Sequence, residues 1–445
     1  MAGISVALSG GGHRASLFGL GALVYLVDSG RNRDVTSIAS VSGGSLTNGF
    51  IAQQLNFRST TAEDFRREMK PFVSLLANRG TLFAIPLTKI YLIVLALAAG
   101  ATIVVPICLD VSGWLKLAIV LTGILLTAGF AKLRGQVCVR AFAKLLFTPS
   151  TKPTKLSDVH KELDHVICAT DLHAGEHAYF SGRFVCAYRF GWGTPGSLAL
   201  HRAVQASAAL PGAFPPAWFF TSEHDFKDAQ DPEAVRAHHL VLADGGVYDN
   251  MGDQWGQGAA ARNGRWAQHD PNLEIPDELI VVNSSAGLGF KSTASMKTPI
   301  LGEISALLRD KSVLYDNGTS VRREALVARF DLAERENKGI KGALVHIPQS
   351  PLRIARAFQS SPAWPERARR AETVLKLLGN DEAEWEDIAK KNAVVKTTLS
   401  KLGVEVSARL LRHGYALAMA NLHVVRGYPL IDVPSQAYFE ELAKQ

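Results

Sequence analysis

The stretch Val35-Thr36-Ser37-Ile38-Ala39-Ser40-Val41-Ser42-Gly43-Gly44 decides the fold, because a strand pattern ends there on a tight turn. Residues 35 to 41 are mostly β-branched or apolar, and Ser45 to Gln53 follow a helical pattern. A nucleophile elbow has this form, with a serine held on a strained turn between a strand and a helix. Ser42 is therefore the candidate nucleophile. Ser40 departs from the glycine of the usual elbow pattern, although serine is small enough to fit.

An earlier strand-to-helix turn carries a cluster of glycines. Ile4 to Leu8 predicts a strand and His13 to Val27 a helix, with Ser9-Gly10-Gly11-Gly12-His13-Arg14 spanning the turn between them. Glycines let backbone N–H groups point into one concavity at a helix N-terminus, which suits a phosphate or the oxyanion of an acyl transfer. Arg14 adds positive charge. The turn lacks both Gly-Lys-Ser/Thr and G-x-G-x-x-G, which disfavours nucleotide binding. A purely structural turn stays an alternative.

The third candidate is Asp244-Gly245-Gly246, which follows the strand-like run Leu240 to Ala243. A carboxylate at the C-terminal end of a strand lies where α/β sheets build their sites, so Asp244 is the candidate base for Ser42. An unperturbed aspartate, with a pKa of about 3.9, is a poor base for serine, and the pairing requires partial desolvation. A turn aspartate without a catalytic role is one alternative. A Ser-His-Asp triad is another, and its histidine would be one of His269, His346, His413 and His423.

Two uncharged runs, Ile90 to Leu109 and Leu117 to Ala131, predict a helical hairpin. The first run has the length of a membrane span, whereas the second is shorter and needs help from flanking Trp114 and lysines. Basic residues flank the hairpin at both ends, so the positive-inside rule places both ends in the cytoplasm. We expect a transmembrane or membrane-embedded hairpin. A buried helical insertion or a shallow re-entrant hairpin is the alternative.

Composition narrows the class of protein further. The formal charge is +7 and the pI is about 9.2, but no basic stripe with interleaved aromatic residues indicates a nucleic-acid partner. The four cysteines lack C-x-x-C spacing, so we expect neither a disulfide framework nor a metal site, and a reducing compartment is the simpler interpretation. The N-terminus lacks the basic and apolar regions of a secretion signal and is expected to form the first strand.

Taken together and in this order, the three motifs resemble the patatin-like phospholipase family. Three linking segments resemble it as well: Ala169 to Glu176, Ala206 to Pro216 and Asp244 to Asn250. The resemblance implies a Ser-Asp dyad with an oxyanion hole in the glycine turn. The residues it assigns are Ser42 and Asp244 for catalysis, Gly10, Gly11, Gly12 and Arg14 for the oxyanion hole, and Gly44, Gly245 and Gly246 as support for the elbow and the dyad.

The predicted fold is a three-layer α/β/α sandwich with a mostly parallel central sheet, an inserted hydrophobic hairpin and a helical C-terminal region. Leu240 to Ala243 and Leu279 to Asn283 are expected as buried parallel strands. The predicted parts are a first core segment over 1–88, the hairpin over 89–134, a second core segment over 135–290 and a mainly helical region over 291–445.

The resemblance also implies the activity. We expect a phospholipase A or lysophospholipase that acts on a phospholipid or another lipid ester and has the bilayer as its partner. The predicted location is the inner or cytoplasmic membrane, with the catalytic domain facing the cytoplasm. No metal or organic cofactor is expected. A lipid acyltransferase that uses the same dyad, and a catalytically inactive lipid-binding scaffold, are the alternative functions.

Overall fold

The computed structural model describes residues 3–285, 287–289, 298, 301–379 and 381–444. Within them a ten-stranded sheet has the order β10-β9-β1-β2-β3-β4-β5-β6, and β8 pairs with both β3 and β7. The strands are β1 (Ile4–Leu8), β2 (Val35–Val41), β3 (Asp164–Asp171), β4 (Glu176–Phe180), β5 (Val185–Ala187), β6 (Gly191–Gly193), β7 (Ala217–Phe220), β8 (His239–Asp244), β9 (Glu278–Asn283) and β10 (Lys341–His346).

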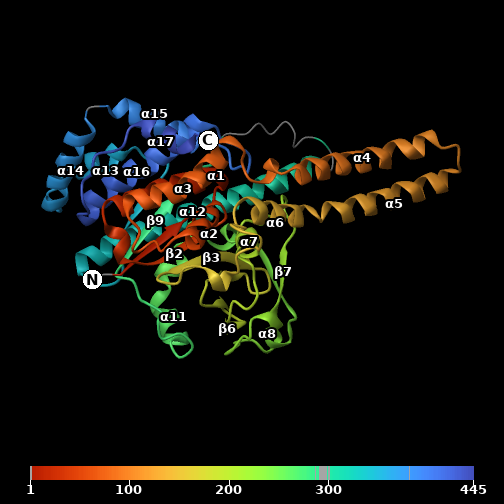
Figure 1. Ribbon diagram of the computed structural model, residues 1–445, viewed down its shortest axis with the longest axis horizontal. Helices are drawn as coiled ribbons and strands as arrows, with labels where there is room; N and C mark the ends of the chain where they lie inside the picture. Colours follow the sequence, from red (N-terminus) through yellow and green to blue (C-terminus); the bar gives the residue numbers. More distant parts are fainter. Residues whose placement is uncertain (1–2, 286, 290–297, 299–300, 380, 445) are drawn as a thin grey trace.

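The helices cover both faces of this sheet (Figure 1). Their bounds are α1 (Gly12–Asp28), α2 (Gly43–Gln54), α3 (Ala62–Asn78), α4 (Pro86–Cys108), α5 (Gly113–Ala131), α6 (Arg134–Leu145), α7 (Leu200–Ser207), α8 (Pro232–Arg236), α9 (Gly246–Asp249), α10 (Gln254–Gln257), α11 (Ala259–Trp266), α12 (Leu301–Glu336), α13 (Pro351–Phe358), α14 (Pro365–Leu378), α15 (Glu382–Ala393), α16 (Val404–Arg426) and α17 (Gln436–Ala443).

The three layers follow from the alternation of side chains along the strands. Ile4, Val6 and Leu8 of β1 belong to one apolar cluster with α1 and α16, whereas Ala7 belongs to another with Phe330 of α12. Because both faces are buried, β1 is apolar at nearly every position, and this pattern is typical of parallel strands. The predicted α/β/α sandwich with a mostly parallel sheet is confirmed.

Strands β10, β9, β1, β2 and β3 form the parallel part of the sheet. The predicted parallel strand at Leu279 to Asn283 is confirmed as β9. The prediction for Leu240 to Ala243 was wrong in direction, because β8 runs antiparallel to both β3 and β7. An apolar run shows that a strand is buried, but its direction is set by how the chain returns to the sheet.

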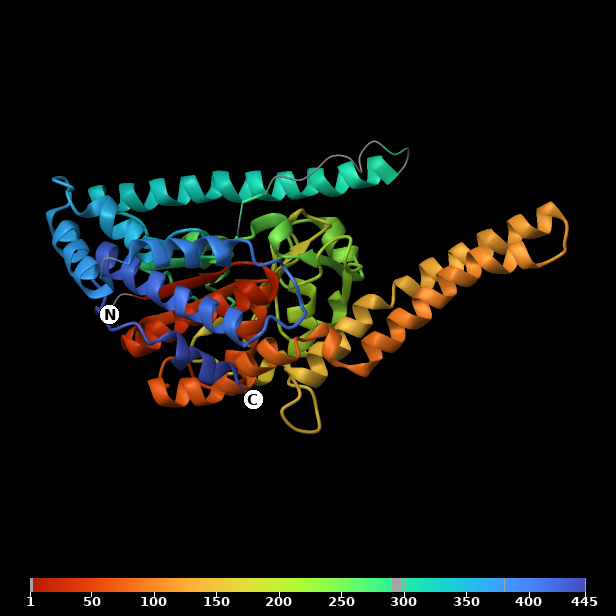
Figure 2. The same ribbon diagram turned by 90° about the horizontal axis from the view of Figure 1, so that it is seen from above.

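The C-terminal region is built into the same body as the N-terminal strands. Strand β10 extends the parallel sheet beside β9, and α16 packs along α1 in the helical layer. Helix α12, 36 residues long, lies along one side of the body, as Figure 2 shows. The region is therefore mainly helical, as predicted, but it also supplies an edge strand. The predicted boundary at residues 290–291 lies outside the described residues.

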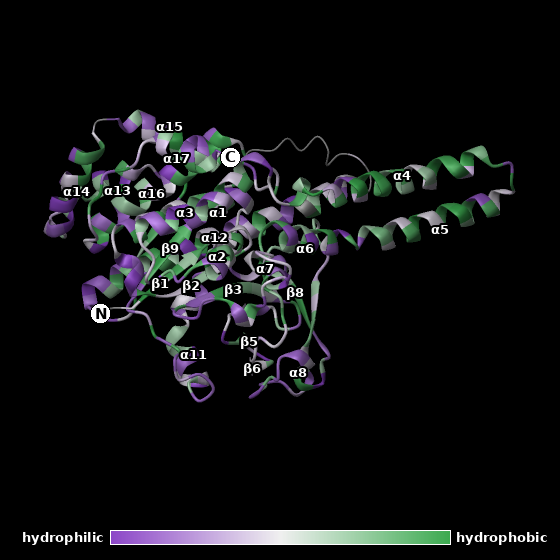
Figure 3. Ribbon diagram, in the orientation of Figure 1, coloured by the Kyte–Doolittle hydropathy of each residue, from purple (hydrophilic) through white to green (hydrophobic). Residues whose placement is uncertain are grey.

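Helices α4 and α5 form a hairpin that projects from the body (Figures 1 and 2). Two helical stretches, over 86–108 and 113–145, are long and apolar enough to cross a membrane by length and composition. Figure 3 shows hydrophobic residues along the whole hairpin. Its apolar side chains face outwards: Ile107 and Leu125 are each 73% exposed. The hairpin therefore has no covering layer within the described protein.

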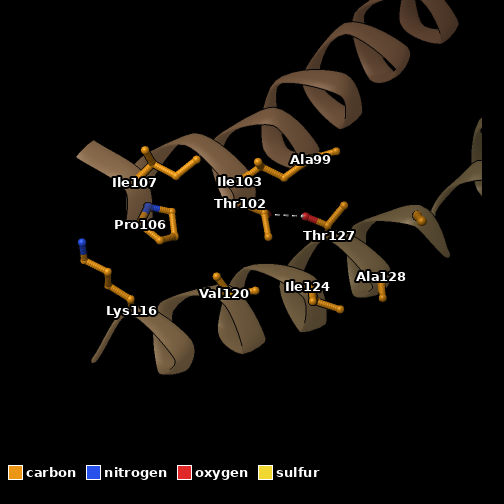
Figure 4. Close-up of a pocket in the computed structure, with 11 residues that line it drawn as sticks. Ala99, Thr102, Ile103, Pro106, Ile107, Lys116, Val120, Ile124, Thr127 and Ala128 are labelled. Atoms are coloured by element: carbon orange, nitrogen blue, oxygen red, sulfur yellow. Dashed lines mark hydrogen bonds between the residues drawn. The ribbon is translucent and has the colours of Figure 1, made fainter. Parts of the chain in front are cut away.

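The two hairpin helices touch along an apolar groove, shown in Figure 4. The Thr102 and Thr127 hydroxyls lie 3.4 Å apart across it, and Lys116 lines its end near the loop that joins the helices. At the other end, Tyr91 stacks on Phe130 and donates to the Ala131 carbonyl at 3.1 Å. These contacts hold the two helices together where they leave the body.

Candidate active site

Ser42 stands on a strained turn between β2 and α2. Its backbone has φ 51° and ψ −114°, a conformation that costs a residue with a Cβ about 1–3 kcal/mol. Neighbouring glycines permit the turn: a Cβ on Gly43 would overlap the Gly12 carbonyl, and one on Gly44 would lie 2.6 Å from the Leu8 carbonyl oxygen. The geometry is that of a nucleophile elbow, which presents the serine hydroxyl above the sheet edge.

A network of buried hydroxyls supports the elbow from below. Ser207 of α7 accepts the Ser42 N–H at 3.0 Å and donates to the Cys168 carbonyl at 2.6 Å. Ser45 and Ser207 share a hydrogen bond of 2.9 Å. Ser40, the departure from the glycine pattern, is fully buried and accepts from Ser45 at 3.1 Å. Its hydroxyl is therefore a member of this network, which explains why serine fits where glycine is usual.

The glycine turn packs directly against the elbow. The Gly10 N–H donates to the Asn250 carbonyl at 2.9 Å, and a Cβ on Gly10 would lie 3.4 Å from Ser42 Cβ. Gly11 and Gly12 have φ values of 141° and 60°, which residues with a side chain rarely adopt. Within the described residues the N–H groups of Gly11 and Gly12 have no hydrogen-bond acceptor. Two donors at the start of α1 are thus available beside Ser42.

Strand register brings Asp244 to Ser42 across about 200 positions of sequence. Val41 pairs with Cys168 of β3, and the next residue of β3, Ala169, pairs with Asp244 of β8. Asp244 follows an antiparallel strand, yet this register places it level with the end of β2. Gly245 is required there because a Cβ would overlap the Cys168 carbonyl.

Burial sets the acidity of Asp244. The residue is 2% exposed, and burial raises its pKa to about 6 against the opposing effects of the Gly246 N–H and the Ser42 hydroxyl. The Gly246 N–H donates to Oδ1 at 2.8 Å. Oδ2 completes no hydrogen bond within the described part of the chain, although the Ser42 hydroxyl lies close enough to lower the pKa. A base with one oxygen unoccupied is ready to accept a proton.

Two further residues at the site come from α12, and the sequence motifs did not reveal them. The Tyr315 hydroxyl approaches Asp244 and would lie 2.8 Å from a Cβ on Gly246. Lys311, one turn earlier, donates to the Pro211 carbonyl at 2.6 Å, and its charge lowers the pKa of Asp244. The sequence of this helix contains no local motif that would mark a site.

These groups open onto one cavity of about 280 Å³. Arg14 lines it and is 7% exposed; its guanidinium donates to the Val395 carbonyl at 2.5 Å, and burial lowers its pKa to about 10. Within the described residues Arg14 has no carboxylate partner, so it keeps a positive charge next to the glycine turn. The other lining residues are Gly10, Gly11, Ser42, Leu210, Asp244, Asn250, Ser285, Leu288, Lys311, Ser312, Tyr315, Asp316, Thr319 and Thr397.

The four histidines considered for a triad have other partners. His269 bonds to Asp228 at 2.6 Å, His346 to the Ser285 carbonyl at 3.2 Å, and His413 to the Gln349 carbonyl at 2.9 Å. His423 lies between Thr373 and the Tyr428 carbonyl. None of them lines the cavity around Ser42. Within the described residues no group of three His, Cys, Asp or Glu side chains is arranged to hold a metal ion.

The geometry combines four features that acyl transfer requires. A serine is held on a strained turn, a buried carboxylate lies beside it, two backbone N–H groups have no acceptor among the described residues, and a cation lines the same cavity. Such an arrangement can attack a carbonyl carbon and stabilise the oxyanion that forms. The sequence predicted Ser42, Asp244 and the glycine turn as one site, and the structure brings all of them together.

Comparison with known proteins shows which family the sequence matches. The model of the family "Patatin-like phospholipase" matches residues 6–252, more than half of the 445 residues. No curated protein matches the chain. Among solved structures, human GIVD cytosolic phospholipase A2 is similar with a TM-score of 0.43 and 12% identity, over 99% of this chain and 60% of that one. VipD from Legionella pneumophila is similar with a TM-score of 0.30 and 13% identity, over 100% of this chain and 88% of that one.

Proposed function

This chain belongs to the patatin-like phospholipase family, and from that premise we propose that it is a membrane-associated serine acyl hydrolase of phospholipids or lysophospholipids. Lipid ester hydrolysis is the activity that the family supports. The finer assignment rests on one observation: Ser42 and Asp244, far apart in sequence, line the same cavity as Gly10 and Gly11 of the glycine turn.

In the proposed reaction Asp244 accepts the proton of the Ser42 hydroxyl as its oxygen attacks the ester carbonyl. The N–H groups of Gly11 and Gly12 stabilise the oxyanion, and Arg14 adds positive charge. Collapse of the tetrahedral intermediate releases the lipid alcohol, which takes up the proton held by Asp244, and leaves an acyl-enzyme on Ser42. Water, deprotonated by Asp244, then attacks the acyl group, and the carboxylic acid leaves as the serine regains its proton.

The membrane part of the proposal rests on α4 and α5. Helix α4, with 23 residues, is about 35 Å long, and α5, with 19 residues, about 29 Å, against a hydrocarbon core of about 30 Å. Lys89, Lys132 and Arg134 lie at the end joined to the body. We therefore place the hairpin in the bilayer and the catalytic body on the cytoplasmic side of the inner or cytoplasmic membrane.

The end of the hairpin that joins the body contacts a segment at the edge of the catalytic cavity. Arg134 donates to the Ala213 carbonyl at 2.7 Å, and a Cβ on Gly135 would lie 3.0 Å from Pro215. Leu210, at the start of the same segment, lines the cavity. The segment from Leu210 to Pro215 thus runs from the base of the hairpin to the cavity that contains Ser42. This supports a short path from the bilayer to Ser42. We retain the hairpin over 89–134 as an insertion within the catalytic domain.

Covalent labelling tests the proposal. A fluorophosphonate probe should modify Ser42 in the folded protein, and Ser42→Ala should abolish the modification. Incubation with a defined phospholipid and a neutral ester should release free fatty acid. A new lipid ester in place of the acid would identify an acyltransferase that uses the same acyl-enzyme. Absence of both labelling and turnover in folded protein would instead identify an inactive lipid-binding scaffold.

A further inference from the structure

A second pocket of about 330 Å³ shares no lining residue with the catalytic cavity. Its walls come from β4, α9 and α11 and are largely aromatic. Tyr179, Tyr188, Tyr248 and Trp266 contribute rings, and Arg262 and Arg265 contribute positive charge. Of these side chains only Tyr248 lies in a segment that resembles the family, and the proposed reaction uses none of them.

Buried arginines set this pocket apart. Among the described residues three arginines are at least nine-tenths buried: Arg14, Arg262 and Arg367. Arg367 lies 3.7 Å from Glu334, so its charge is compensated. Arg14 and Arg262 have no carboxylate within ion-pair distance in the described chain, and each lines a cavity. Because a buried charge without a counter-ion is costly, these two positions favour an anion from outside the protein.

The surroundings of Arg262 hold its guanidinium in place without neutralising it. The group stacks on Trp255 at 3.8 Å from the ring centre and donates to the Gln254 carbonyl at 3.3 Å. A Cβ on Gly258 would lie 2.9 Å from Nη1, so glycine leaves the room that the guanidinium occupies. Its Nε has no hydrogen-bond acceptor within the described residues. Neutral carbonyls and rings therefore orient the cation, and its charge remains available to the pocket.

Arg265 adds a second cation of the same kind. Its guanidinium stacks over Tyr188 at 4.2 Å and Trp266 at 4.9 Å, and it also has no ion-pair partner in the described chain. Glu176 is the one carboxylate among the pocket-lining residues, and it lies beyond ion-pair distance of both arginines. The lining carries a net positive charge between flat apolar walls, which suits an anion attached to a planar group.

We propose that this pocket binds a small ligand that carries a carboxylate or phosphate on a flat apolar group, with Arg262 and Arg265 as the anion-binding residues. The proposal goes beyond the hydrolase activity, because the site is separate from Ser42. The pocket is also connected to the catalytic base. Tyr248 lines the pocket, and Gly246, two residues earlier in α9, donates its N–H to Asp244 at 2.8 Å.

Helix α12 provides a second connection between the two cavities. Arg322 lies 3.3 Å from Asp249, at the end of α9, and 3.6 Å from Asp253. The same helix presents Lys311 and Tyr315 to the catalytic cavity two to three turns away. Tyr248, which lines the pocket, and Asp249, which pairs with Arg322, therefore connect the pocket through α9 and α12 to residues near the base.

Calorimetric titration of the full chain, purified in a lipid nanodisc, tests the site with phenyl phosphate. We expect one bound ligand per chain, at least about tenfold tighter than phenol, since one charge-assisted contact is worth that factor or more. Arg265→Gln, which removes one cation, and Ala261→Phe, which fills part of the pocket and keeps both arginines, should each weaken binding about tenfold. Arg262→Lys should bind more tightly than Arg262→Gln.

The controls separate this pocket from the catalytic site. Arg236→Gln removes an exposed arginine without an ion-pair partner in the described chain and should leave the affinity unchanged. Chains labelled at Ser42 by a fluorophosphonate should still bind phenyl phosphate, and binding should also persist if the protein has no hydrolase activity. Loss of binding upon labelling, equal affinity in Ala261→Phe, or no binding to the unmodified chain would overturn the proposal.

Discussion

The catalytic body and the α4–α5 hairpin use the same apolar residue types in opposite ways. Leu17 and Phe18 of α1 are fully buried, whereas Ile107 and Leu125 of the hairpin are each 73% exposed. Exposed apolar surface costs about 25 cal/mol per Å², and no other part of the described chain covers the hairpin. The body completes its own core. We propose that the body performs the chemistry and that the hairpin determines where it happens.

Substitutions in the proposed dyad should have the largest effect on activity. Ser42→Ala and Asp244→Asn should each lower kcat by at least about 10²-fold, on a soluble short-chain ester as well as on vesicle phospholipid, because the attacking group or its base is lost. Initial rates on both substrates measure the effect. Circular dichroism and a thermal melt confirm that each variant is folded. Near-normal turnover by a folded Ser42→Ala protein would disprove the assignment.

Charged substitutions in the hairpin should affect only the membrane-bound reaction. Leu125→Asp puts a charge into a segment where insertion costs about 2.5–3.5 kcal/mol, so vesicle binding should fall by at least about tenfold. Hydrolysis of a soluble ester should stay within about twofold. Vesicle flotation and initial rates provide the two measurements.

A matched exposed position on the body serves as the control. Val394 is 78% exposed but lies outside the hairpin, so Val394→Asp should leave vesicle binding unchanged. If Leu125→Asp and Val394→Asp bind vesicles equally well, the hairpin has no role in membrane association. If Leu125→Asp reduces soluble-ester turnover as strongly as vesicle binding, the two regions are not separate in function.

Sequence patterns predicted the parts of the molecule that depend on neighbouring residues. Strand β1 and strand β2 begin and end where their apolar runs do, and the hairpin follows from two uncharged stretches. The candidate site could also be predicted from the sequence, because the glycine turn, the Ser42 elbow and Asp244 each have a local sequence motif. Their meeting in space was an inference from the family resemblance, and the strand register explains it.

Features that depend on contacts between distant residues could not be predicted from the sequence. The direction of β8 is set by its pairing with β3, and a short apolar run contains no information on that choice. Tyr315 and Lys311 reach Asp244 because α12 crosses the cavity, far beyond the last motif. The shift in the pKa of Asp244 likewise comes from burial by many residues. Such effects require the folded structure.

The pH dependence of hydrolysis tests the environment of Asp244. Burial raises the pKa of this carboxyl to about 6, and only the ionised form accepts the serine proton. The rate should therefore be constant above pH 7 and fall about tenfold per pH unit below 6. Measurement of kcat/KM on a soluble ester between pH 4 and 8 checks this. A midpoint near 4, the value of an exposed aspartate, would show that Asp244 is not desolvated in the active protein.

Replacement of Tyr315 should give the smallest effect and the most specific one. The Tyr315 hydroxyl lowers the pKa of Asp244, so Tyr315→Phe should move the midpoint of the pH profile upwards while removing one oxygen from the cavity. A contact worth about 0.5–1.5 kcal/mol raises the midpoint by about 0.4–1.1 pH units, which corresponds to about a twofold to sevenfold decrease in kcat/KM at pH 6. At pH 8, where Asp244 is ionised in both proteins, much of this difference should disappear. A purely structural role of Tyr315 predicts instead an equal loss at both pH values, because a distorted site is impaired whichever protonation state the base adopts.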